Sequence, residues 1–155
     1  MATSVIPSVI DALVTAARAA LPSVQVHDGY GVTDDPGDFL MVGVTDPDSG
    51  DDANSAVSQQ SWANATGGAR DENGDITCVA LSWNGDGNQK TARDAAFAIA
   101  AAVQLAVRPA GLPGALSVPG VLWLAYGAET QLLQQQGDGG AVAKVIFSIA
   151  FRARV

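Results

Sequence analysis

The sequence contains very little of the chemistry on which most enzyme and metal sites depend. Among its 155 residues there is one cysteine, Cys78, and one histidine, His27. A single cysteine excludes an intrachain disulfide, and a single histidine excludes metal sites built from several imidazoles. Cys78 lies in a strand-like run, where we expect it to pack as a small hydrophobic residue, which fits a reducing compartment.

Positive charge is also scarce. Eight residues are Lys or Arg and sixteen are Asp or Glu, so the net charge is −8. Clustered basic residues supply most of the affinity for nucleic-acid phosphates and for anionic membranes, so this balance argues against both binding classes. The N-terminal region has no basic segment, and Asp11 interrupts its apolar run, so we expect neither a signal peptide nor a membrane span.

What remains is a predominantly small and apolar composition. Apolar residues make up 48% of the chain, whereas charged residues make up 15% and aromatic residues 6%. These values predict one globular domain over residues 1–155. Because Ala and Val dominate the apolar residues, we expect a core of small side chains, part of which neighbouring copies could complete.

The clearest local pattern is the period-two alternation of the last fifteen residues, which predicts a long strand that completes a sheet. Its apolar face is expected to lie under the helices and contains Val145, Phe147, Ile149 and Phe151. The opposite face carries Lys144, Arg152 and Arg154 in an otherwise acidic protein.

Helical spacing of apolar residues predicts two helices, over 5–21 and 89–107, the second capped by Asn88 or Asp86. Before the C-terminal strand, further strands are predicted over 24–27, 39–44, 56–62, 75–83 and 121–129, with turns over 66–75 and 131–140. The order α-β-β-β-β-α-β-β predicts the α+β class, a mainly antiparallel sheet with two helices packed on it. Strand 56–62 is rich in Ser and Gln, which indicates a sheet edge or a partner-facing surface.

No catalytic, cofactor-binding or metal-ligating residue emerges from the motifs. His27 has no Gly-x-Ser-x-Gly nucleophile elbow to serve and is expected at a strand end facing solvent. The acidic runs 46–52 and 71–75 lack the Gly and Glu that a calcium loop needs at its sixth and twelfth positions, so we expect solvated loop acids. Sixteen acids leave a catalytic carboxylate pair open, and with it a small hydrolase, although no spacing singles out a pair.

Three strings spread over the chain resemble the tail terminator proteins of long-tailed, siphovirus-like bacteriophages, especially those that infect actinobacteria. They are DDPGDFLMVGVTDPD at 34–48, TCVALSWNGD followed by KTARDAAFAI at 77–99, and GAVAKVIFSIAFRARV at 140–155. The resemblance implies a structural protein rather than an enzyme. It also implies a ring, expected to contain six copies, that caps the tail tube, stops its polymerisation and joins it to the head-completion or neck proteins.

The same resemblance implies a protein of the virion tail or neck, assembled in the host cytoplasm, with genomic DNA passing through the ring without specific binding. A closed ring needs one surface patch to meet a different patch of the next copy. We expect the ring contacts among the acidic loop, strand 56–62 and the basic face of the last strand, with these candidate residues: Asp46, Asp48, Asp51, Asp52, Trp62, Lys144, Arg152 and Arg154. Another neck or tail-completion protein, such as a head-closure protein or a tube subunit, stays open as the alternative.

Overall fold

The computed structural model describes residues 3–31, 37–45, 54–108 and 115–155 of the chain. The elements follow one another as α1 (Ile6–Ala20), β1 (Gln25–Asp28), β2 (Phe39–Val42), β3 (Ala56–Trp62), β4 (Arg70–Asn84), α2 (Gln89–Ala106), β5 (Val121–Gly137) and β6 (Gly140–Arg154). This order confirms the predicted α+β class.

Helix α1 forms where apolar residues recur at helical spacing and a proline suits the first turn. Pro7 occupies that turn, and Val9, Leu13 and Ala17 make a buried stripe. The helix ends at Ala20, and the backbone N–H of its C-cap residue Leu21 donates to Ala17 O at 2.9 Å.

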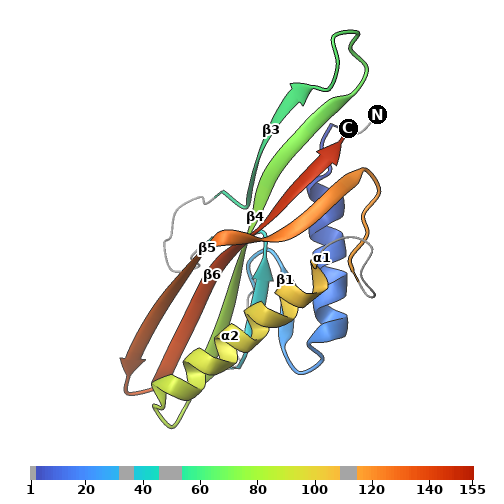
Figure 1. Cartoon of the computed structure of the whole chain (residues 1–155). Helices are drawn as coiled ribbons and strands as arrows, with labels where there is room; N and C mark the ends of the chain where they lie inside the picture. Colours follow the sequence, from blue (N-terminus) through green and yellow to red (C-terminus); the bar gives the residue numbers. More distant parts are fainter. Residues whose placement is uncertain (1–2, 32–36, 46–53, 109–114) are drawn as a thin grey trace.

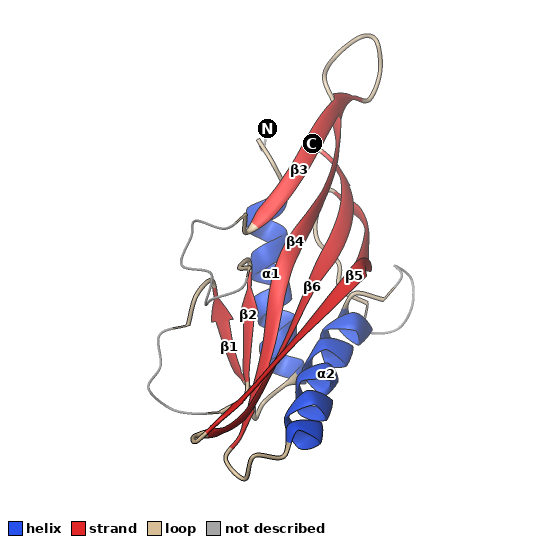
Figure 2. Cartoon of the chain, turned by 90° about the vertical axis from the view of Figure 1, so that its left-hand side faces the viewer, coloured by secondary structure: helices blue, strands red, loops and turns tan. Residues whose placement is uncertain are grey.

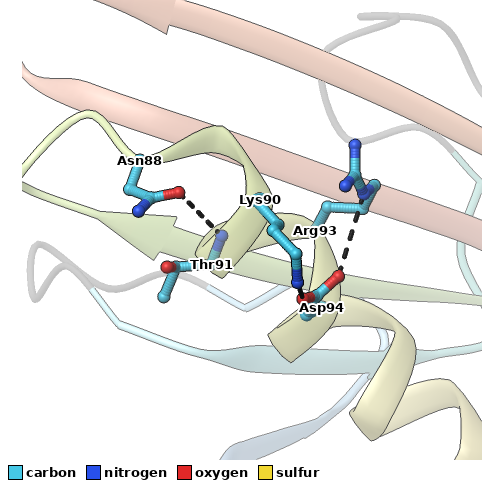
Figure 3. Close-up of polar contacts among 5 residues, drawn as sticks. All are labelled: Asn88, Lys90, Thr91, Arg93 and Asp94. Atoms are coloured by element: carbon cyan, nitrogen blue, oxygen red, sulfur yellow. Dashed lines mark hydrogen bonds and ion pairs between the residues drawn. The ribbon is translucent and has the colours of Figure 1, made fainter.

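Helix α2 begins at the predicted cap. The side chain of Asn88 accepts a hydrogen bond from the Thr91 backbone N–H at 3.1 Å (Figure 3). In the next turn, Lys90 and Arg93 both approach the carboxylate of Asp94, Arg93 at 3.8 Å. The Lys90 ammonium, as a hydrogen-bond donor, holds the pKa of Asp94 below its ordinary value.

The strands form one sheet in the order β1-β2-β4-β6-β5, and β3 pairs with the free side of β4 beyond β2. The β1–β2 pair is parallel and the other pairs are antiparallel. Strand β6 lies between β4 and β5 and pairs with both along almost its whole length. Figure 1 shows the β3–β4 hairpin extending beyond both helices.

Both helices pack on one face of this sheet and bury its core. Helix α2 lies over β6 and β4, whereas α1 packs against β1, β2 and α2. The large apolar side chains that β6 buries in this core are the predicted ones: Val145, Phe147, Ile149 and Phe151. The prediction that β6 lies under the helices is therefore confirmed for α2, which packs on β6. Helix α1 packs mainly on β1, β2 and α2, and it shares one hydrophobic core with β6. Cys78 is buried in the same core, as expected, and burial raises the pKa of its thiol to about 12.

Two predicted turns are wrong because they are mostly strand. Strand β4 begins at Arg70 rather than Asp75, and β5 continues to Gly137, which leaves only Asp138 and Gly139 as the turn. The polar composition of both stretches is typical of loops, but β6 supplies a continuous ladder for each of them. Strand β2 ends at Val42 instead of continuing to Val44, because Gly43 adopts a φ of +77° that strand geometry does not accommodate.

Candidate assembly surface

The sheet face opposite the helices is left uncovered by α1 and α2. In Figure 2, the long strands pass in front of α1 with this face toward the viewer. Polar side chains occupy most of it, and a small apolar cluster of Met41, Val44 and Val79, with Ile146 against it, lies near its middle.

A shallow groove of about 450 Å³ runs across the upper part of this face. Val57 and Gln59 of β3 line one side, Asn73 and Asp75 of β4 line its floor, and Trp123 of β5 closes the other side. The exposed fractions of Val57 and Trp123 are 53% and 42%. Such exposure of large apolar side chains beside polar ones is typical of a protein–protein contact surface.

Arg152 and Arg154 both meet the carboxylate of Asp71 in their own chain. Arg154 Nε donates to Asp71 Oδ1 at 2.6 Å and Arg152 Nη2 to Oδ2 at 3.4 Å. The hydrogen bond from Arg154, reinforced by Arg152, holds the pKa of Asp71 below its ordinary value. The two arginines remain about half exposed, at 44% and 51% for their side chains, so they have surface left for a neighbouring copy.

Trp62 lies at the end of β3, beside the hairpin turn, with 67% of its surface exposed. The guanidinium of Arg70, its partner in the β3–β4 register, lies 5.5 Å from the centre of its ring. Arg70 also donates to Gln60 Oε1 at 3.0 Å. The tryptophan is thus held in place by its own chain while its outer face stays available.

The other predicted contact residues differ in their accessibility. Lys144 lies on the sheet face opposite the helices, but only 8% of its surface is exposed. Little of its side chain is therefore accessible to a neighbouring copy. Asp46, Asp48, Asp51 and Asp52 lie outside the described residues. The structure brings Arg152 and Arg154 together at Asp71, a residue that the sequence analysis had assigned to a turn.

Glu72 is the buried charged group that the sequence analysis missed. It is fully buried on the helix-bearing face rather than solvated in a loop. Its carboxylate accepts hydrogen bonds from Ser4 Oγ at 2.6 Å, Val5 N at 3.0 Å and Ser58 Oγ at 2.8 Å. Burial raises the pKa of Glu72, but these donors outweigh it and the net pKa lies below the ordinary value of 4.5. The carboxylate therefore ties the start of α1 to β3 and β4.

His27 is another departure from expectation. Its Nε2 atom is buried instead of facing solvent and has no hydrogen-bond partner among the described residues, and its ring lies 5.9 Å from that of Phe39. Within the described ranges, no three or more His, Cys, Asp or Glu side chains lie close enough together to hold a metal ion. Across those same residues, no helix is both long and apolar enough to cross a bilayer.

Strand β3 is an edge strand, as its composition predicts. It pairs with β4 over all seven residues in a regular antiparallel register. In the part of the chain that the structure describes, no strand pairs with its outer side. Strand β5 forms the opposite edge of the sheet in the same way.

The whole chain has the fold of a known virion component. It superposes with a TM-score of 0.66 on a chain from the virion of a native gene transfer agent particle, and the match covers 99% of this chain and 100% of that chain. The two sequences are 14% identical, so the likeness establishes the fold. No protein-family model matches the sequence, and no curated protein sequence matches it.

Proposed function

We propose that this protein is a structural component of a virion, and specifically the tail terminator of a long-tailed phage or phage-like particle. The observation that carries the proposal is the fold shared with a chain of a gene transfer agent virion, over nearly the full length of both chains. The position at the end of the tail rests on the resemblance of the three sequence strings to tail terminators. In this proposal the chain performs no catalytic step.

The proposed assembly is a ring of six copies that caps the tail tube and offers its other side to a neck or head-completion protein. A closed ring needs a heterologous interface, in which two different patches of each copy meet. The chain offers several separate patches: the groove beside Trp123, the exposed face of Trp62, and the arginine pair at Asp71. Contacts through these patches require no catalytic group, which is consistent with a purely structural role.

The proposal can be tested by deleting the gene for this protein from the genome that encodes the particle. Without a cap to stop polymerisation, tails should become abnormally long and variable in length, and filled heads should lack tails. Electron microscopy of lysates measures both effects, and the wild-type gene supplied in trans should restore normal tails.

Other outcomes separate the alternatives. Tails of normal length that fail to join heads would indicate a head-closure protein, and complete loss of tails would indicate a tube subunit. Normal, infectious particles would contradict any structural role. Light scattering of the purified protein adds a second test, since six copies of the 15.7 kDa chain have a mass of about 94 kDa.

A further inference from the structure

Strand β3 and residues 130–137 of β5, which lie at two edges of the sheet, lack the features by which proteins usually prevent strand addition. Charged residues, prolines and bulges normally protect an exposed edge. Strand β3 contains none of them over its seven residues, AVSQQSW. In β5, the register shifts are confined to the part before Thr130, and residues 130–137 are regular, uncharged and free of proline.

The free edge of β3 exposes a definite set of backbone groups. Ala63 N–H donates to Ala69 O at 3.0 Å, and Thr77 N–H donates to Ser55 O at 3.1 Å, at the two ends of the β3–β4 ladder. Because hydrogen-bonded residues alternate in an antiparallel pair, the odd-numbered residues of β3 bond to β4. Ser58 and Gln60 therefore direct their N–H and C=O groups outward.

The free edge of β5 has the same alternation. Gly137 and Gly140 are partners on either side of the two-residue turn, so the odd-numbered residues of this part of β5 bond to β6. Leu132 and Gln134 direct their backbone groups outward. Each edge thus presents a run of about seven residues whose donors and acceptors at alternate positions pair with no strand in the described part of the chain.

The strand directions allow these two edges to join. Strands β5, β6, β4 and β3 alternate in direction across the sheet, because each neighbouring pair is antiparallel. A β5 strand placed beside β3 would continue the alternation. When Gln60 lies opposite Leu132, Ser61 lies opposite Gln131, and both strands keep their helix-side and open-side residues on matching faces.

The positions of the two edges along the sheet also suit closure. Strand β3 pairs with residues 70–76 of β4, at the end of the sheet where β6 finishes, whereas residues 130–137 of β5 pair with the beginning of β6. Joining them displaces each copy along the strand direction relative to the last one. Such a stagger is what a sheet requires to close into a barrel.

We propose that the outer edge of β3 in one copy pairs antiparallel with residues 130–136 of β5 in the next copy. The sheets of the ring then form one continuous barrel, with the helices outside and the open sheet face toward the lumen. The partner is a second copy of this chain, and the inference rests on the proposed ring. The contact is heterologous, as a closed ring demands.

Cysteine cross-linking tests the pairing and its register. Ser61→Cys combined with Gln131→Cys in one chain places the two thiols opposite each other on the same face of adjacent copies, at a spacing that a disulfide spans. Mild oxidation should give a ladder of covalent multimers that ends at the ring. The native Cys78 is buried and its thiol pKa is raised to about 12, so it should not react.

Two controls make the result specific. Ser61→Cys with Gln134→Cys places the thiols on opposite faces and should give no ladder, and each single variant should stay uncross-linked because β3 does not meet β3. A ring that forms normally while the 61–131 pair yields no covalent multimers, or in which single variants cross-link, would overturn the edge pairing and leave the proposed ring intact. A chain that stays monomeric both alone and on assembled tail tubes would contradict the proposed function itself.

A backbone substitution provides an independent measurement. Gln60→Pro removes an outward N–H while leaving the β3–β4 ladder bonds in place, and Gln60→Ala removes the same side chain but keeps the N–H. We expect the proline variant to lose the ring peak in size-exclusion chromatography and the alanine variant to keep it. Equal ring formation by two folded variants would overturn the proposal, and if Gln60→Pro does not fold, the cross-linking result decides.

Discussion

Replacement of Glu72 by glutamine should destabilise the fold without changing its shape. The substitution preserves the size of the side chain but removes the negative charge that accepts bonds from Ser4, Val5 and Ser58. Each hydrogen bond to a charged group contributes about 1 kcal/mol more to stability than a bond to a neutral group. The favourable interaction of the negative charge with the N-terminus of α1 contributes about 0.5 kcal/mol more. Relief of the buried charge offsets part of this, so we expect a loss of about 2–3 kcal/mol.

Urea or thermal unfolding at pH 7, followed by circular dichroism at a concentration where the chain is monomeric, measures this loss. For a chain of this length, the midpoint should fall by about 5–10 °C. Glu129→Gln is the matched control, because Glu129 is an exposed acid on β5, and it should change stability by less than about 0.5 kcal/mol.

The pH dependence checks the charge itself. The pKa of Glu72 is lower in the folded chain than its ordinary value of 4.5, so its contribution is fully present above that value. It is lost as the pH falls through the folded pKa, where the carboxylate takes up a proton. The difference between wild type and Glu72→Gln should therefore shrink as the pH falls below 4.5. Equal stabilities at pH 7 would refute the inference that this carboxylate is charged and bound.

Three further predictions concern packing, assembly and the lumen. Gly74→Ala should lower the free energy of unfolding in urea by about 2 kcal/mol or more. The added Cβ would lie 2.4 Å from Val57 O and 2.8 Å from the ring of Phe151, the cross-strand partner of Gly74. Wild-type stability of this variant would mean that β3 shifts freely. Arg152→Glu with Arg154→Glu should impair ring and tail assembly, and normal assembly in complementation would show that this face serves only its own chain. If the acidic loop lines the lumen of a ring with a formal charge of about −48, it repels passing DNA. Genome ejection should then slow when its aspartates become asparagine, and unchanged ejection would exclude this role for Asp46, Asp48, Asp51 and Asp52.

The sequence predicted elements well where periodicity and capping act locally. Strand β3 has the predicted bounds, 56–62. Helix α2 begins at the predicted residue 89, and Asn88 caps it. Helical stripes and turn residues depend on near neighbours, so composition and spacing are enough to locate them.

The missed strand segments depend on residues far away in the sequence. Residues 71–74, DENG, have low strand propensity, yet they pair with residues 151–154 of β6 at the other end of the chain. The same long-range pairing determines the candidate site: Asp71 reaches Arg154 only because they are opposite each other in that ladder. Glu72 could be distinguished from a loop acid only by knowing that α1 begins beside it.

Strand β6 has a consequence for the order in which the chain can fold. It follows the other described strands in the sequence, yet it is the sole partner of β5 within the described sheet and pairs with β4 over fourteen residues. While the ribosome is still adding β6, β5 has no strand to pair with, and the core lacks Phe147 and Phe151. The pairing of β4 with β6 joins residues far apart in the sequence, and such contacts form late and slowly. An incomplete chain that lacks β6 therefore cannot hold β5 in the sheet or complete the core.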